Sequence, residues 1–95
     1  MSPERPFEIA VEIVNERGLH ARAAAKFTAL VERFDAVIDV SNGRESVGGR
    51  SIMGLLMLGA ARGTTITVSA DGADAGAALD AIRALVEDGF GEDRD

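Results

Sequence analysis

The chain has 95 residues, of which 46% are hydrophobic and 27% are charged, so we expect one small globular domain over residues 1–95. It contains no cysteine, which excludes disulfides and thiolate metal sites, and it contains a single histidine. The net charge of −6 argues against nucleic acid or an anionic membrane as the main partner. The sequence shows neither a signal peptide nor an apolar run of about 20 residues, so we expect a soluble cytoplasmic protein.

The amino-terminal part of the chain predicts a strand followed by a helix. Residues 7–14 alternate apolar and polar side chains, which is typical of a strand with one solvent-facing side. Residues 15–18 predict a turn. In residues 21–34 the apolar side chains recur at the spacing that places them on one face of a helix.

The middle of the chain predicts a hairpin and a short helix. Two β-rich runs, residues 36–41 and 44–48, flank the pair Asn42-Gly43. This pair favours a type I′ turn, in which both central residues take a positive φ. An apolar stretch then lies between Ser51 and Gly59, residue types that commonly cap the start and the end of a helix.

The carboxyl-terminal part adds an alternating strand over residues 65–70 and a helix that begins at Ala75 and stops at Gly89. The resulting order is β-α-β-β-α-β-α. Each strand has one apolar face, and an α+β fold with a four-stranded, mainly antiparallel sheet covered on one face by three helices satisfies them all. We expect an ordered core over about residues 7–90, with loose ends outside it.

Charge is distributed unevenly along the chain. The segment from Arg17 to Arg62 contains seven basic and four acidic residues, a net charge of +3, whereas the rest of the chain carries −9. A basic segment in an acidic protein predicts that this segment meets a negatively charged partner.

The single histidine, His20, lies in this basic segment, between a turn and an alanine-rich helix. The first N–H groups of a helix lack intrahelical partners and attract anions. Arg17 and Arg22 flank His20, and each can bind an oxyanion through two N–H groups. Positive neighbours favour the neutral imidazole, whose free nitrogen can act as a nucleophile. These residues suit a histidine that carries a phosphoryl group, but an ordinary polar residue at a helix start is an equally open interpretation.

Two segments resemble a known family. Residues 18–23 read GLHARA and resemble the active-site motif of the HPr family, the histidine phosphocarriers of the phosphoenolpyruvate-dependent phosphotransferase system. Residues 50–59 read RSIMGLLMLG and are similar to the regulatory-serine helix of that family. The resemblance covers about residues 7–91 and implies the open-faced β-sandwich of the family.

The resemblance also implies roles for individual residues. His20 would accept a phosphoryl group from enzyme I on Nδ1, the pros nitrogen, and pass it to a histidine of an enzyme IIA protein. Arg22 would stabilise the phosphoryl oxygens. The protein would then be a monomeric carrier rather than an enzyme, without cofactor or metal. Where the family usually has proline, this chain has Ala23, which adds one N–H to the first helical turn, and we expect a changed transfer rate rather than lost function.

Apolar side chains surround the predicted helix after Ser51 almost completely. A buried core helix is one interpretation, but so short a helix cannot easily bury every face, and methionine adapts to unlike partners. We expect Ile52, Leu55 and Leu56 or their neighbours to face inward and some of Met53, Met57 and Leu58 to face outward. The predicted partner-binding residues are Arg17, Lys26, Ile52, Met53, Leu56 and Met57.

Ser51 is predicted to cap the short helix, a contact worth about 1 kcal/mol. The resemblance implies that Ser51 is also the serine that HPr kinase/phosphorylase modifies. A phosphate there would add a charge of about −1.5 to −2 and would repel an acidic partner. Phosphorylation of Ser51 is therefore predicted to inhibit transfer from enzyme I.

The branch of the family and the class of function leave alternatives open. HPr-like carriers serve sugar uptake or a regulatory branch linked to nitrogen metabolism, and residues 55–58 (LLML) and 88–93 (DGFGED) look more like the regulatory carrier, NPr. The alternative is a non-catalytic ligand-sensing or protein-docking module, which predicts no special use of His20. Nucleic-acid binding is disfavoured because the chain is acidic and poor in aromatics, and metal binding because it has one histidine.

Overall fold

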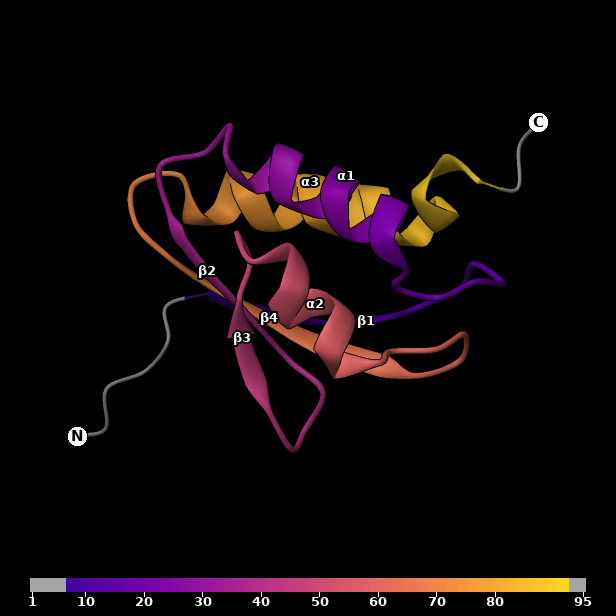
Figure 1. Cartoon of the computed structure of the whole chain (residues 1–95). Helices are drawn as coiled ribbons and strands as arrows, with labels where there is room; N and C mark the ends of the chain where they lie inside the picture. Colours follow the sequence, from indigo (N-terminus) through magenta and orange to yellow (C-terminus); the bar gives the residue numbers. More distant parts are fainter. Residues whose placement is uncertain (1–6, 93–95) are drawn as a thin grey trace.

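A computed structural model describes residues 7–92 of the chain (Figure 1). The strands are β1 (Phe7–Glu12), β2 (Val37–Ser41), β3 (Ser46–Gly48) and β4 (Thr65–Asp71). The helices are α1 (Ala21–Val31), α2 (Ile52–Leu58), α3 (Ala75–Glu87) and a short 3-10 helix, η1 (Gly89–Gly91). The order β-α-β-β-α-β-α confirms the prediction, with η1 as an addition at the carboxyl-terminal end.

The four strands form one sheet in the order β1-β4-β2-β3, and every neighbouring pair is antiparallel. The alternation of side chains gives this sheet two different faces. On β4, for example, Ile66, Val68 and Ala70 are buried, whereas the residues between them are partly or fully exposed. The sheet is therefore apolar on one face and polar on the other, as the sequence alternation predicts.

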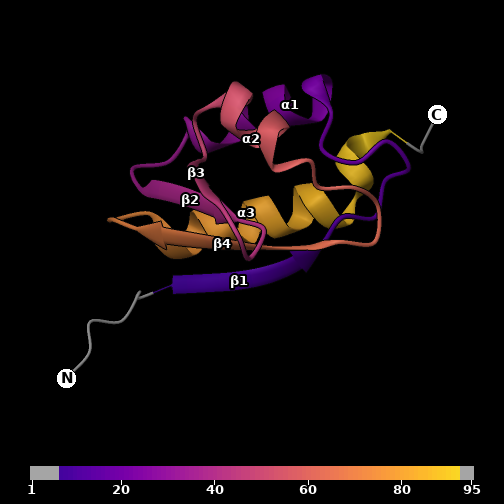
Figure 2. The same cartoon turned by 60° about the horizontal axis from the view of Figure 1, so that its bottom comes forward.

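The helices cover the apolar face (Figures 1 and 2). Helix α3 packs on β1 and β4, α2 packs on β3 at the opposite edge, and α1 contacts both of the other helices. This arrangement confirms the predicted α+β open-faced sandwich. It also places the amino end of α1 beside the carboxyl-terminal turn that follows α3 (Figure 1).

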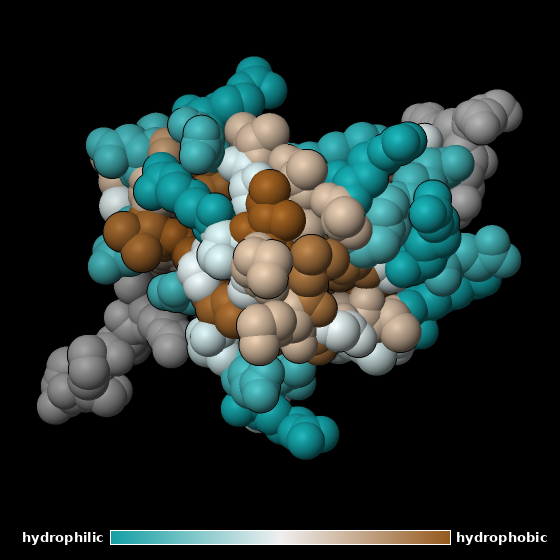
Figure 3. Space-filling model, in the orientation of Figure 1, coloured by the Kyte–Doolittle hydropathy of each residue, from teal (hydrophilic) through white to brown (hydrophobic). Residues whose placement is uncertain are grey.

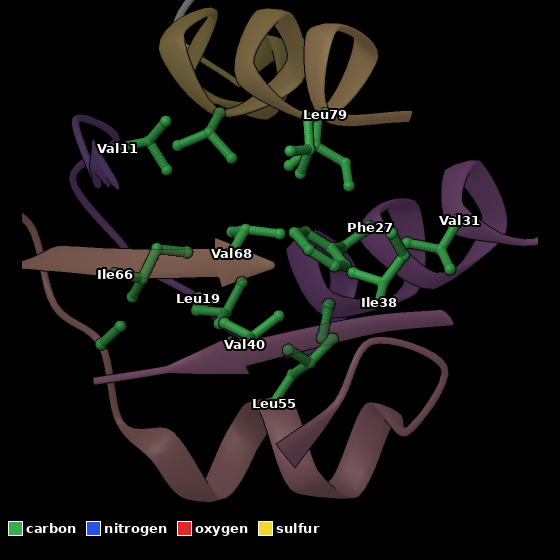
Figure 4. Close-up of a cluster of buried hydrophobic side chains, with 14 of the residues drawn as sticks. Val11, Leu19, Phe27, Val31, Ile38, Val40, Leu55, Ile66, Val68 and Leu79 are labelled. Atoms are coloured by element: carbon green, nitrogen blue, oxygen red, sulfur yellow. The ribbon is translucent and has the colours of Figure 1, made fainter. Parts of the chain in front are cut away.

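The core lies between the helices and the sheet (Figure 4). Phe27 of α1 is fully buried and points toward Ile38 and Val68 of the sheet. Leu55 of α2, also fully buried, points toward Val40. Each large apolar side chain buried in this way contributes about 1.5–3 kcal/mol. Helix α1 is therefore fixed by its buried face, and the residues at its amino end are fixed with it.

The hairpin between β2 and β3 is confirmed, but its turn differs from the predicted type I′. Gly43 has a φ of +95°, whereas Phe90 is the one non-glycine residue with a positive φ in the described range, so Asn42 does not take the left-handed conformation. The Oδ1 atom of Asn42 instead accepts from the backbone N–H groups of Arg44 at 2.9 Å and Glu45 at 2.8 Å. These side-chain bonds organise a four-residue loop in place of a two-residue turn.

The carboxyl-terminal end also differs from the prediction of a loose end after residue 90. Gly89, Phe90 and Gly91 all have positive φ values, of +66°, +57° and +74°, which turn the chain back toward the core. Phe90 is buried there, with 1% of its surface exposed. Gly91 and Glu92 consequently belong to the folded chain, while residues 93–95 lie outside the described range.

Candidate functional site

His20 caps the amino end of α1. Its backbone is extended, with φ −85° and ψ −178°, and its Nδ1 accepts a hydrogen bond from the backbone N–H of Arg22 at 3.2 Å. A serine, threonine, aspartate or asparagine oxygen usually fills this role. The imidazole nitrogen that replaces it lies directly at the positive end of the helix dipole.

Further N–H groups are available at this helix end. The carbonyl of His20 accepts the first intrahelical bond, from Ala24 at 2.8 Å. Within residues 7–92, no group accepts a hydrogen bond from the backbone N–H of Ala21 or Ala23. A group with several negative oxygens bound at Nδ1 would meet these donors. The Ala23 donor exists because this position is not occupied by proline.

The second ring nitrogen of His20 contacts a residue from the far end of the chain. Oε2 of Glu92 pairs with Nε2 of His20, although 72 residues separate the two. Oε1 of Glu92 accepts from Nδ2 of Asn15 at 3.1 Å, and the same amide group donates to the carbonyl of Gly18 at 2.8 Å. Sequence reasoning missed both Asn15 and Glu92 as site residues. The sequence did contain one indication that this end of the chain folds back. Phe90 is a large apolar residue two positions before Glu92, and burying its side chain requires the chain to turn inward.

The environment of Glu92 keeps it ionised at neutral pH. Burial acts to raise the pKa of its carboxyl group. The hydrogen bonds from His20 and Asn15, together with the electrostatic attraction of His20 and Arg17, outweigh burial and lower the pKa below the ordinary value of 4.5. A negative charge therefore lies against the ring of His20.

The predicted basic residues around His20 have different environments. Arg22 and Arg17 are exposed, and Arg17 acts on the carboxylate of Glu92 through its charge. Lys26, predicted as a partner-binding residue, donates from Nζ to the carbonyl of Phe90 at 2.7 Å. Lys26 therefore holds the carboxyl-terminal turn against α1.

Helix α2 begins and ends as the sequence predicts. Oγ of Ser51 accepts from the backbone N–H of Gly54 at 2.9 Å, and Gly59, with φ +62°, ends the helix. Ser51 is exposed. No hydrogen bond or ion pair joins Ser51 to His20 in the part of the chain that the structure describes.

The faces of α2 partly differ from the prediction. Met53 and Met57 point outward as expected, with 68% and 73% of their surfaces exposed, and Leu55 is buried. Ile52 and Leu58 exchange their predicted places, because Ile52 is 41% exposed and Leu58 only 6%. Spacing puts both on the side of Leu55, but Ile52 stands in the first turn, where less of the core covers it.

Exposed apolar side chains gather over α2, with hydrophilic side chains on either side (Figure 3). Leu56, also predicted to bind partners, is half-buried on this helix. Because α2 packs against α1, this apolar surface and His20 are carried by two helices in contact.

Other kinds of site find less support. Within residues 7–92 no cluster of three histidine, aspartate or glutamate side chains is arranged to hold a metal ion. No helix in that range is long and apolar enough to cross a membrane. The polar face of the sheet contains a hollow of about 310 Å³ lined by Glu8, Asp39, Ser41, Ser46, Thr67 and Ser69. Within residues 7–92, no hydrogen bond joins Asp39, Ser41, Ser46, Thr67 or Ser69 of this hollow to the site at His20.

Comparisons with known proteins agree with this geometry. Residues 7–88 match the family model PTS-HPr, described as "PTS HPr component phosphorylation site". A phosphocarrier protein NPr from Shewanella violacea is 49% identical over 85 residues, which are 90% of this chain and 93% of that protein. A phosphocarrier protein HPr from Neisseria meningitidis is 46% identical over 83 residues, 87% of this chain and 93% of the relative.

Solved structures show the same likeness in three dimensions. An HPr structure from Thermoanaerobacter tengcongensis superposes with a TM-score of 0.87 at 39% identity and covers 92% of this chain and 98% of its own. An HPr dimer from the same organism superposes with a TM-score of 0.73 at 40% identity, covering 90% of this chain and 99% of its own.

Proposed function

The chain belongs to the HPr family of phosphotransferase-system proteins, and from this we propose that His20 accepts a phosphoryl group on Nδ1 from phospho-enzyme I and donates it to enzyme IIA proteins. Membership makes the chain a phosphocarrier of this system, a carrier rather than a catalytic enzyme. The observation that supports the assignment to His20 is the position of Nδ1 at the amino end of α1.

The geometry fits what phosphoryl transfer requires, which is mainly positioning and charge stabilisation. The backbone N–H of Arg22 already points at Nδ1, and those of Ala21 and Ala23 lack acceptors among the described residues. The guanidinium of Arg22 is exposed and has the length to reach oxygens bound at Nδ1. We assign Arg22 to stabilising the phosphoryl group during its transfer.

The apolar surface over α2 is proposed to dock the partner proteins. Met53 and Met57 are the most exposed large apolar side chains of this helix, and flexible methionine side chains suit a carrier that must meet unlike partners. Exposed Arg17 lies near the site and adds positive charge that would attract acidic partners. Ile52 and Leu56 would contribute the remainder of the contact.

Ser51 is proposed as a regulatory phosphorylation site for HPr kinase/phosphorylase. Ser51 is an exposed residue, and it stands at the start of the helix that carries the docking surface. Negative charge is tolerated by the fold at a helix start, but it would repel an acidic partner at that surface. Phosphorylated Ser51 would therefore lower the rate of transfer from enzyme I.

The setting of the carrier is part of the same proposal. We place it in the cytoplasm, as a monomer, and in the regulatory branch linked to nitrogen metabolism rather than in sugar uptake. The segments LLML and DGFGED support the branch assignment, and relatives carry both names, HPr and NPr. Transfer to each IIA protein of the organism, measured separately, would identify the branch, and sedimentation would give the oligomeric state.

The central test mixes the purified protein with enzyme I and phosphoenolpyruvate. The parent should take up one phosphate that is labile in acid and stable in base, and His20→Ala should take up none. If His20→Ala accepts phosphate as well as the parent, the assignment to His20 is wrong. If the parent accepts none, the alternative of a ligand-sensing or docking module without chemistry gains support.

A further inference from the structure

A chain of hydrogen bonds reaches the nitrogen of His20 that the proposed transfer does not use. Nδ2 of Asn15 donates to Oε1 of Glu92, and Oε2 of Glu92 pairs with Nε2 of the ring. Asn15 and Glu92 are 77 residues apart in the chain, so only the fold brings them together. The side chain of His20 is 18% exposed and that of Glu92 is 14% exposed, which shields the pair from much of the solvent.

The two contacts of the ring require the same tautomer. Nδ1 accepts from the backbone N–H of Arg22, so Nδ1 carries the lone pair. Nε2 faces a carboxylate, which can only accept, so Nε2 carries the proton. The nucleophilic lone pair is thereby assigned to Nδ1, the nitrogen at the helix end.

Asn15 is held in the orientation that serves Glu92. Asn15 is completely buried, and its Nδ2 donates both to Glu92 and to the carbonyl of Gly18. Its Oδ1 is left without a partner in the described chain, which is costly for a buried oxygen. A flipped amide would place Oδ1 against the carboxylate of Glu92, where the two oxygens would repel each other. The observed orientation of the amide therefore preserves the hydrogen bond to Glu92, although it leaves Oδ1 of Asn15 without a hydrogen bond in the described chain.

The carboxyl-terminal turn fixes Glu92 from the other side. Phe90 is buried and left-handed, with φ +57°, a conformation that a side chain of this size rarely takes unless its surroundings enforce it. Nζ of Lys26 holds the carbonyl of Phe90 at 2.7 Å. Glu92 follows two residues after Phe90. Helix α1 therefore carries His20 at its amino end and also carries Lys26, which holds the turn that brings Glu92 to His20.

We propose that Glu92, oriented by Asn15, is a positioning residue that keeps the proton on Nε2 of His20 and balances the positive charge of the ring while Nδ1 carries phosphorus. This inference rests on the proposed function. It concerns a residue that contacts His20 but not the reacting nitrogen.

The chemistry balances without any proton moving. On acceptance, the lone pair of Nδ1 forms a bond to phosphorus while the bond between phosphorus and the donor histidine breaks. Because Nε2 keeps its proton, the phosphorylated ring is a cation, and the carboxylate of Glu92 neutralises it. On donation, the bond between Nδ1 and phosphorus breaks, its electrons return to Nδ1, and the ring leaves as neutral imidazole. A ring that lost the Nε2 proton would have to leave as an anion, which is a poorer leaving group.

The test compares the parent with Glu92→Gln, which keeps the size of the side chain but removes its charge. Glu16→Gln is the matched control, because Glu16 is an exposed acid in the turn before His20. ¹⁵N NMR of the histidine ring reports which nitrogen carries the proton, with and without phosphate. In the phosphorylated form, removing the carboxylate should make the Nε2 proton easier to lose. We expect half of the rings in Glu92→Gln to have lost it at a proton concentration about tenfold higher than in the parent. Glu16→Gln should match the parent.

The unphosphorylated proteins give a second comparison that needs no partner protein. The parent should show a protonated Nε2 and a bare Nδ1, and the Nε2 resonance should move in Glu92→Gln but not in Glu16→Gln. An Nε2 resonance that ignores Glu92→Gln would overturn the inference. So would unchanged proton loss from the phosphorylated ring. If the Nε2 resonance responds but the parent takes up no phosphate, the proposed function fails while the contact between Glu92 and His20 stands.

Discussion

Replacing Gly18 with alanine should lower the free energy of unfolding by more than the same replacement costs at a left-handed glycine that has free space around it. Gly18 has φ +68°, a conformation that costs a residue with a side chain about 1–2 kcal/mol. A Cβ at this position would also lie 2.6 Å from the carbonyl oxygen of Ala60 and 3.0 Å from Cα of Ala61. Both are backbone atoms, so relief requires a backbone shift, which adds about 1–3 kcal/mol.

Gly59 offers a matched control for the conformational part of this cost. Its φ is +62°, but a Cβ there would have no heavy atom within 4 Å apart from its chain neighbours. Gly59→Ala should therefore lose only about 1–2 kcal/mol of the free energy of unfolding. The difference between the two variants isolates the approach of the Gly18 turn to Ala60.

The assay is urea unfolding of the parent and both variants, followed by transfer from enzyme I. Gly18→Ala should lose at least about 1 kcal/mol more than Gly59→Ala, a gap of about 4–8 °C in melting temperature for a domain of this size. It should also slow phosphoryl acceptance, because the carbonyl of Gly18 binds both the N–H of His20 and the side chain of Asn15. Equal losses in the two variants would refute the steric argument.

Four further predictions follow from the site and its surroundings. Ser51→Ala should lose about 1 kcal/mol of stability in urea unfolding, because it removes the N-cap hydrogen bond. Ser51→Asp should keep the cap and the stability but accept phosphate from enzyme I several-fold more slowly than the parent. Equal rates for Ser51→Asp and the parent would contradict the proposed regulation. Ala23→Pro should change stability by less than about 1 kcal/mol. It should slow acceptance of the phosphoryl group about fivefold, because proline lacks the N–H that would donate one hydrogen bond to that group. An unchanged rate would show that the N–H of Ala23 does not contact the phosphoryl group. Met57→Ser should change stability by less than about 0.5 kcal/mol and raise the KM for enzyme I, whereas Val37→Ser, at a position 62% exposed on β2, should do neither. Because the pKa of Glu92 is lower in the folded chain than its ordinary 4.5, its contribution to stability is complete above that pH and is lost as the pH falls through the folded value, so acid should destabilise the parent more than Glu92→Gln in unfolding curves measured from about pH 6 to pH 3.

His20 could be found from the sequence because everything that defines it is local. A glycine turn, a histidine and a run of alanines are adjacent in the chain, and the hydrogen bond from Arg22 to Nδ1 spans two residues. The same holds for Ser51, whose cap bond spans three residues. Short-range capping rules apply directly to such sites.

Glu92 could not be found in this way. Its contact with His20 spans 72 residues and depends on three successive left-handed residues, one of which is Phe90. No propensity favours that conformation for phenylalanine, which takes it here because its side chain is buried and Lys26 binds its carbonyl. The exchange of Ile52 and Leu58 has a similar origin, since helical spacing gives the face of a residue but not how far the core extends along the helix.

The two hydrogen bonds of the His20 ring differ in strength: the bond at Nδ1 is weak and the bond at Nε2 is strong. A phosphoryl carrier that uses Nδ1 needs this order. At Nδ1 the partner is a neutral backbone N–H at 3.2 Å, a long hydrogen bond that an incoming phosphorus can displace. The displaced N–H stays at the helix end, where it can donate to a phosphoryl oxygen instead. At Nε2 the partner is a carboxylate, and charge-assisted bonds of this kind are about twice as strong as neutral ones. The ring is therefore held firmly at the nitrogen that keeps its proton, and weakly at the nitrogen that changes partners in each transfer, under the function proposed above.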